Sequence, residues 1–444
     1  WGIFPSLSAG WVISNEDFMQ ATSSWLNFLK LRASWGRNGN QDVIPFAYQA
    51  DISTEGFNYF FGPNHSIITV GSTPARVPNS EAHWETSEQT NIGTDMYILG
   101  NKLQFSLDWY RKDTKDWLII APSTSLNGTE APLLNGGNVR NSGIETMIRW
   151  NHRQGDFKYS VSGTFAYNKN RMTSIPSADS IIHGPASQLG NNTTEMFRCE
   201  AGKPIGFFWG YKTDGVIQDE ADLIAYNSQG TAVGDSAYYS YSSLSPGDLK
   251  FVDTDGDGDI DTDDKIMLGD PHPDFIFGLQ ISLEYKGIFL NMTGYGQAGM
   301  QVAKSYRSAD SQHDNWTTEV YETWNGPGTS YRLPRVVQGG RRSWNEISDI
   351  YIYDADFFRV SNLTIGCDLK RFIKILPVKE LRVYGAANNL LVLTKYNGMD
   401  PEVSYSPTEI YDDDPDNDYQ WGGGIDVGVY PQARTFMLGV NITF

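Results

Sequence analysis

The chain has 444 residues, a formal net charge of −19 at pH 7, 40% hydrophobic residues and 13% aromatic residues. Its excess of acidic residues argues against nucleic acid as a partner, because binding to a phosphate backbone depends on surplus Lys and Arg. No run approaches the roughly 18 to 20 consecutive apolar residues that a membrane-spanning helix needs, which excludes a helical membrane protein.

Alternation of apolar and polar residues with a period of two is the dominant pattern, and it predicts β-strands with one apolar face. The segments 103–109 and 436–444 show it most clearly. Several segments reach the ~9 to 11 residues that a tilted strand needs to cross a bilayer. The predicted strands, about eleven in all, lie near residues 4–14, 26–35, 86–97, 102–120, 140–152, 156–170, 274–286, 287–296, 356–372, 380–393 and 432–444.

The predicted connections alternate between short and long. Short connections fall near residues 15–25, 99–102, 152–155, 286–287 and 373–379. Long connections span about 36–85, 121–139, 171–273, 297–355 and 394–431. A membrane β-barrel has this parity, with tight turns on one rim and large loops on the other. A soluble sandwich, solenoid or propeller has no reason to keep it, and no fixed repeat period supports those folds.

The fold class expected is therefore all-β, an antiparallel transmembrane β-barrel of which this chain supplies about eleven C-terminal strands. An open sheet would leave unpaired backbone groups in hydrocarbon, so further strands are expected to come before residue 1 in the parent protein or from a partner chain. Barrels of this kind conventionally keep the C-terminus in the periplasm, which makes 171–273 and 297–355 large extracellular loops.

Blocks spread over nearly the whole chain resemble the SusC/RagA-like TonB-dependent transporters of Bacteroidetes. They include WETSEQTNIGTDMYI at 84–98, LQFSLDWYRKDTKDWLI at 103–119, NVRNSGIETMIRW at 138–150, PGDLKFVDTDGDGDIDTDD at 246–264, GDPHPDFIFGLQISLEYKG at 269–287, NNLLVLTKYNGMDPEV at 388–403 and the terminal RTFMLGVNITF. The resemblance implies a barrel of about 22 strands with a plug in its lumen. The plug domain, the TonB box and the N-terminal barrel strands are not in this sequence.

The same resemblance implies a role in active import of glycans or peptides across the outer membrane. The partners it implies are a SusD-like surface lipoprotein, the TonB complex acting through the missing N-terminal part, the rest of the barrel with its plug, and outer-membrane lipid. Two alternatives are a passive porin-like channel and a soluble surface polysaccharide-binding β protein. An enzyme is not expected, because no GxSxG, P-loop or GxGxxG motif follows the required strand.

The strongest local motif is the acidic run at 253–264. Its oxygen-bearing residues have the spacing of a calcium-binding loop, with glycine at the sixth position. The predicted Ca²⁺ ligands are Asp253, Asp255, Asp257, Asp259, Asp261 and Asp264, with Asp259 contributing its backbone carbonyl. The last ligand is usually Glu, and the shorter Asp264 makes bidentate binding less certain. The alternative is a solvated acidic turn.

Aromatic residues suggest two further roles. Trp316, Trp324 and Trp344 in the loop 297–355 are weak candidates for substrate contact, and packing against a lid protein or neighbouring loops is the alternative. Trp109, Trp117 and Trp150 are expected in the aromatic girdle at the membrane interface. A second acidic run at 412–418 lacks ligand spacing and is expected to be a solvated loop.

Overall fold

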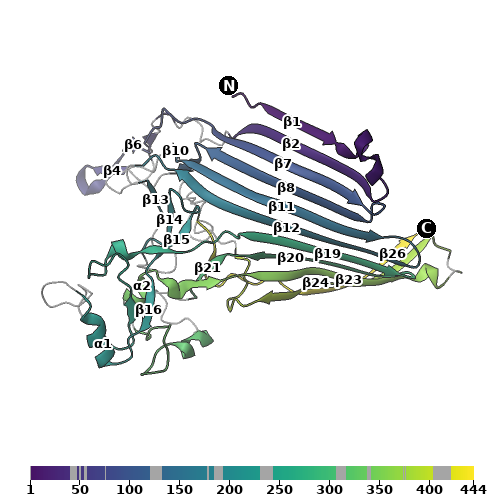
Figure 1. The fold of residues 1–444 in the computed structure, drawn as a ribbon. Coiled ribbons are helices and arrows are strands. Elements are labelled where there is room, and N and C mark those ends of the chain that lie inside the picture. The colour runs from purple at the N-terminus through teal and green to yellow at the C-terminus, as the bar shows by residue number, and fades with distance from the viewer. Residues whose placement is uncertain are drawn as a thin grey trace.

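The computed structural model describes residues 2–40, 48–49, 52–54, 58–75, 77–120, 133–177, 180–184, 194–230, 244–306, 317–337, 342–373, 375, 377–403 and 422–444. Its main feature is one antiparallel sheet of eleven strands, each paired with the next one along the chain (Figure 1). The strands are β1 (Ser6–Val12), β2 (Leu26–Asn40), β7 (Glu85–Ile98), β8 (Leu103–Lys115), β11 (Asn138–His152), β12 (Phe157–Ser174), β19 (Phe275–Tyr285), β20 (Ile288–Ala298), β23 (Phe357–Asp368), β24 (Glu380–Thr394) and β26 (Thr435–Thr443). All eleven predicted strands are confirmed.

Two predicted strands were too long, and one of them, 356–372, extended past the end of β23 at Asp368. The segment 102–120 leaves the sheet after Lys115, because Asp116 takes a left-handed backbone conformation with φ of 57°. Trp117 then packs against a separate hydrophobic core. Its predicted place in the girdle was therefore wrong, whereas Trp109 and Trp150 remain within the sheet.

The parity of the connections is confirmed. Connections 13–25, 99–102, 153–156, 286–287 and 369–379 lie on one rim of the sheet, and connections 41–84, 116–137, 175–274, 299–356 and 395–434 lie on the other. The tightest turn is Lys286–Gly287, where φ is 50° and 93°. Two positive φ values in a two-residue hairpin match the right-handed twist of the flanking strands, and Gly287 adopts one of them without strain.

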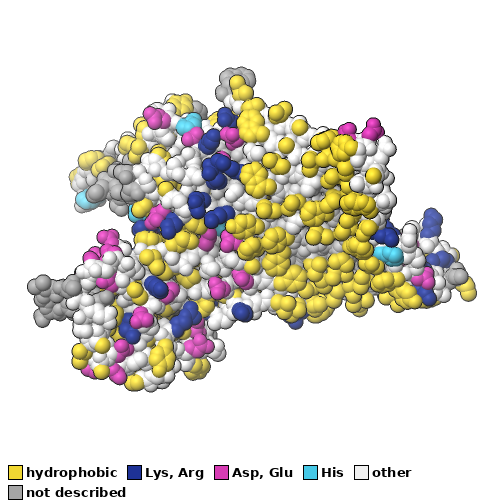
Figure 2. Space-filling model, in the orientation of Figure 1, with side chains coloured by type: hydrophobic (Ala, Val, Ile, Leu, Met, Phe, Trp, Pro, Cys, Tyr) yellow, Lys and Arg dark blue, Asp and Glu magenta, His cyan; other side chains and the backbone are white. Residues whose placement is uncertain are grey.

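The two faces of the sheet differ in polarity because of the strand register. Leu283, Leu290 and Ile365 lie in one cross-strand row. The adjacent row holds Ser282 and Asn291, whose side chains share a hydrogen bond of 2.8 Å. Figure 2 shows the apolar face as a broad yellow band. Its exposed members include Leu7, Trp11, Leu31, Ile92, Leu107, Trp109, Ile144, Ile148, Phe165, Tyr285, Ile365, Leu391, Phe436, Leu438 and Val440.

Beyond the rim with long connections lies a loop domain, by which we mean the described parts of 175–274, 299–356 and 395–434. It has its own core, in which Phe197, Phe208, Phe251, Ile347 and Ile425 are at most 1% exposed. Its elements are β13 (Ile181–His183), β14 (Phe197–Glu200), β15 (Phe207–Gly210), β16 (Thr213–Val216), α1 (Glu220–Asn227), β17 (Leu249–Phe251), β18 (Ile266–Gly269), β21 (Gln301–Lys304), α2 (Arg342–Asn345), β22 (Ile352–Asp354) and β25 (Ile425–Asp426).

The remaining short strands belong to the other two long connections. They are β3 (Ile52–Ser53), β4 (Asn58–Phe61), β5 (Ile67–Val70), β6 (Thr73–Pro74), β9 (Leu118–Ile120) and β10 (Leu133–Asn135). Among the described residues, no helix combines the length and the apolar character needed to cross a membrane.

Candidate functional site

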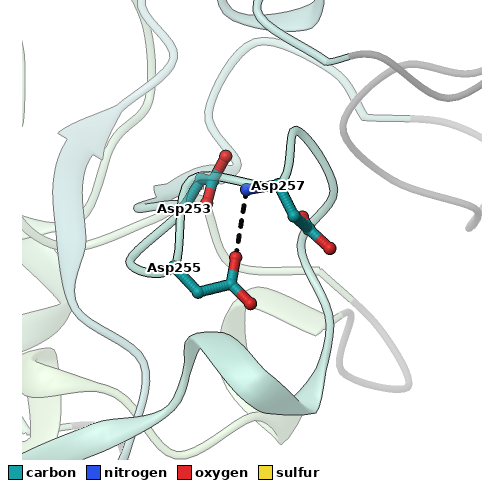
Figure 3. Close-up of side chains that lie close together, drawn as sticks. All are labelled: Asp253, Asp255 and Asp257. Atoms are coloured by element: carbon teal, nitrogen blue, oxygen red, sulfur yellow. Dashed lines mark hydrogen bonds between the residues drawn. The ribbon is translucent and has the colours of Figure 1, made fainter.

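The acidic loop 253–264 lies between β17 and β18 in the loop domain. Asp253, Asp255 and Asp257 hold carboxylate oxygens within 4.8 Å of one another (Figure 3). Asp253 is half-buried, and the other two are exposed. The structure thus brings together three of the six residues that the sequence predicts as calcium ligands.

Hydrogen bonds to the backbone give this loop its shape. The Asp253 carboxylate accepts from the N–H groups of Gly256 at 2.6 Å and Gly258 at 2.9 Å. Asp255 Oδ1 accepts from the N–H of Asp257 at 3.1 Å, which is the dashed line in Figure 3. Gly258 has φ of 89° and stands at the sixth loop position, where calcium loops need glycine for a sharp turn.

The other three predicted ligands have structural contacts. Asp259 Oδ1 accepts from the N–H of Ile260, and Asp261 caps the short 3-10 helix η5 (Thr262–Asp264). Asp264 is 1% exposed and accepts from the N–H of Thr254 at 2.6 Å and of Asp261 at 2.9 Å. Burial raises the pKa of Asp264. Asp264 therefore holds the start and the end of the loop together through hydrogen bonds to the backbone.

The atoms in this loop that could bind a metal ion are carboxylate oxygens. Ca²⁺ takes six to eight oxygen ligands from carboxylates, backbone carbonyls and water, and it tolerates irregular geometry. Three like charges held this close repel one another, and a divalent cation between them would relieve the repulsion. The residue types and the turn at Gly258 therefore fit calcium.

The acidic loop is anchored to the core of the loop domain. Ile260 is 3% exposed and belongs to that core. Arg342, from the next long connection, donates Nη2 to the carbonyl oxygen of Ile260 at 3.0 Å and to the hydroxyl of Tyr211 at 3.3 Å. If residues 253–264 became more or less ordered, the packing of two long connections, 175–274 and 299–356, would therefore change.

The tryptophans proposed for substrate contact lie as follows. Trp316 is outside the described residues, as is the acidic run 412–418. Trp324 and Trp344 are half-buried and pack against the core of the loop domain. Trp344 donates its indole N–H to the carbonyl oxygen of Arg335 at 2.9 Å. Both rings therefore stabilise the loop domain, and their contact with a substrate stays a prediction.

Two buried polar clusters were not predicted from the sequence. Asp426 is fully buried and accepts hydrogen bonds from the hydroxyls of Tyr306 at 2.6 Å and Tyr396 at 2.7 Å. Burial and this carboxylate raise the pKa of both tyrosines. Arg359 on β23 pairs with Asp400 at 2.6 Å, and both are buried. Tyr306 and Asp426 come from different long connections, and Arg359 lies on β23, 41 residues before Asp400, so no local spacing could have signalled these pairs.

Comparison with known proteins defines the class. Residues 1–390 match the family described as TonB dependent receptor-like, beta-barrel, and the chain belongs to this family. A curated relative is TonB-dependent receptor P3 of Formosa agariphila, with 30% identity over 100% of this chain and 42% of the relative. TonB-dependent receptor SusC of Bacteroides thetaiotaomicron is 26% identical over 100% of this chain and 40% of its own length.

Among solved structures, the RagAB peptide transporter superimposes with a TM-score of 0.74 and 20% identity, covering 99% of this chain and 43% of that chain. At this identity the likeness establishes the fold. The eleven-stranded sheet is part of a TonB-dependent receptor barrel, as the resemblance of the sequence blocks predicted. The chain spans about two fifths of the length of the curated relatives it matches.

Proposed function

We propose that the chain forms part of the wall and the outer loops of an outer-membrane importer for glycans or peptides. The observation that carries this proposal is the two-faced sheet of a TonB-dependent receptor, whose long connections all lie on one rim. Strands β19 and β20 have 11 residues each, the length that a tilted strand needs to cross a bilayer. In this arrangement the apolar face meets lipid and the polar face lines the lumen.

The proposal extends to orientation and partners. The long-connection rim faces the outside, and the C-terminus lies in the periplasm. A SusD-like lipoprotein covers the loop domain, and TonB supplies energy through parts of the protein outside this sequence. Support for these partners comes from membership of the family and from the similarity to SusC.

Uptake by intact cells tests the import function. Cells lacking the full-length gene are supplied with glycan or peptide mixtures, and disappearance of each component from the medium is followed with and without a protonophore. The proposal is supported if cells lacking the gene fail to remove one class of solute, glycan or peptide, from the medium and if complementation restores its removal. The restored removal should stop when the protonophore is added. Uptake that continues without the proton gradient would favour a passive channel, and a purified full-length protein that stays monodisperse without detergent would favour a soluble surface protein.

We also propose that residues 253–264 bind calcium. Asp253, Asp255 and Asp257 supply the grouped carboxylates, with Asp259, Asp261 and Asp264 as the remaining predicted ligands. In the proposed orientation the loop faces the outside, where calcium is plentiful. An affinity of about 0.1 to 1 mM, as in extracellular calcium modules, would suffice there.

Calorimetric titration of the full-length protein with Ca²⁺ tests this site. Asp255→Asn removes one grouped carboxylate and should weaken binding about tenfold, since ligand charge sets the affinity of such loops. Asp263→Asn is the matched control, because it removes the same charge from the same loop at a position that is not a predicted ligand. Equal heats for both variants and the parent protein would contradict the proposal.

A further inference from the structure

A group of basic side chains lies on the apolar face of the sheet, just beyond the apolar band at its long-connection end. Figure 2 shows them in dark blue beside the yellow band. We call this group the basic rim. It consists of Arg37 on β2, Arg111 and Lys115 on β8, Arg140 on β11, and Lys169 and Arg171 on β12. All six side chains are at least partly exposed.

Strand register places these residues at one height. Trp109, Ile144 and Tyr167 form the last apolar row across β8, β11 and β12. Two residues further along each strand, Arg111, Ser142 and Lys169 form the next row. A step of two residues is roughly 7 Å along a strand. The first row of cations thus directly follows the last row of the apolar band, which contains Trp109 and Tyr167.

The row after that brings two arginines side by side. Arg140 lies directly opposite Arg171 in the β11–β12 pair, and Asp113 opposes Arg140 on its other side. Asp113 accepts from Arg140 at 2.6 Å and from Arg111 at 2.8 Å. Directly opposed like charges destabilise a strand pair. An anion beside Arg171 would offset that repulsion.

The local balance of charge also opposes that of the whole chain. Six cations of the basic rim face two carboxylates in these rows, Glu88 and Asp113, which leaves four positive charges. The chain as a whole carries −19. Within the described residues, Lys169 and Arg171 form no ion pair. This surplus is confined to β2 through β12, since β19 begins at Phe275, level with Tyr167.

We propose that the basic rim binds the phosphate groups of a phosphorylated glycolipid in the outer leaflet of the membrane. The proposal rests on the proposed function, which turns the long-connection rim outward. A ligand at this height must present its anion at the membrane boundary and its apolar part against the band below. Guanidinium groups pair with phosphate through two parallel hydrogen bonds, and lysine adds a point charge.

Lipid retention by the full-length protein tests the proposal. The protein is purified from outer membranes in mild detergent, exchanged into nanodiscs of phosphatidylcholine doped with lipid A, and analysed by native mass spectrometry. Each basic residue near an anionic lipid surface changes affinity about fivefold. The double variant Lys169→Gln/Arg171→Gln should therefore lower lipid A retention roughly 30-fold while leaving the ion pairs of Asp113 intact.

Lys112→Gln is the matched control. Lys112 neighbours Arg111 on β8 but lies on the opposite face of the sheet, so its loss should leave lipid A retention unchanged. Equal retention by the double variant and the parent protein would overturn the proposal. So would full competition by inorganic phosphate at the concentration of lipid A, because the ligand would then be a free anion.

The lipid that co-purifies from cells separates this proposal from the orientation on which it rests. Selective loss of glycolipid from the double variant supports both. Selective loss of a glycerophospholipid instead would mean that the basic rim faces the inner leaflet, which overturns the glycolipid proposal together with the orientation. Retention that does not change, in a protein that still imports its substrate, would overturn the glycolipid proposal alone.

Discussion

Single residues stabilise the junction between the sheet and the loop domain through buried charges. The Arg359 side chain is 2% exposed, with Asp400 at 2.6 Å and Glu402 at 3.4 Å. Asp400→Ala would leave the buried guanidinium with the longer contact only. We expect it to lower the free energy of unfolding by about 3 to 5 kcal/mol, the cost of breaking a buried ion pair. Denaturant unfolding of the full-length protein in detergent measures the change.

Replacing both partners separates the cost of an orphaned charge from loss of packing. In the double variant Arg359→Met/Asp400→Leu no buried charge is left over from the pair. Apolar replacements of buried ion pairs are often neutral, so most of the lost stability should return. A double variant as unstable as Asp400→Ala would show that the charge itself was not the cause.

His83 gives one long connection a dependence on pH. Its ring lies 2.8 Å from the carbonyl oxygen of Glu81 and 3.4 Å from the carboxylate of Asp116, and these contacts raise the pKa of His83. A raised pKa means that the folded state favours the protonated ring. The stabilisation is complete below about pH 6.5 and is lost as pH rises through the folded-state pKa.

Hydrogen exchange in residues 77–84, corrected for intrinsic rates, should therefore show protection that falls as the pH rises above about 6.5. The change should stay under about 1 kcal/mol, because the imidazole is 57% exposed. In His83→Gln the profile should be flat. A parent protein whose protection does not vary over this range would rule out the ionic contact.

At the scale of strands, the sheet should tolerate charge on one face only. Ile281 on β19 lies in the apolar row with Val161 and Met292, near the middle of the band. In the proposed orientation Ile281→Arg places a cation near the bilayer midplane, which costs about 2 to 4 kcal/mol. Gln280→Arg, one residue earlier, points to the polar face and should cost little. Folded yield and unfolding in lipid vesicles compare the two, and equal losses would contradict a lipid-facing band.

The strands were predictable because their signal is local. Period-two alternation and short turns such as Lys286–Gly287 specify which residues pair, so the eleven strands and the parity of their connections follow from the sequence. Strand ends were less certain. Trp117 keeps the two-residue spacing of Trp109, yet the turn at Asp116 directs it into the core of the loop domain.

The acidic loop was predictable for the same reason, since its ligands are neighbours in sequence. The buried clusters were not. Asp426 meets Tyr306 from 120 residues away, and the hydrogen bond depends on how the long connections pack. The basic rim is a third case. Its six cations are scattered over the sequence between 37 and 171, and they come together only once the register of the five strands β2, β7, β8, β11 and β12 is known.

The two ends of the whole molecule differ: tight turns lie on one rim of the sheet, and a packed loop domain lies on the other. Most structured mass outside the sheet thus lies on a single side of the apolar band. The proposed import function requires this asymmetry to face outward. Orientation is therefore the property of the whole molecule on which the import proposal and the glycolipid proposal both depend.

Cysteine labelling in intact cells tests that orientation. Tyr321 is 86% exposed in the connection 299–356, and Phe372 is 58% exposed in the connection 369–379. In a background free of other accessible cysteines, which includes Cys367→Ser and keeps the buried Cys199, a membrane-impermeant maleimide should label Tyr321→Cys on whole cells. Phe372→Cys should react only after the outer membrane is permeabilised. The reverse pattern would place the loop domain in the periplasm, where it could not receive solutes from outside.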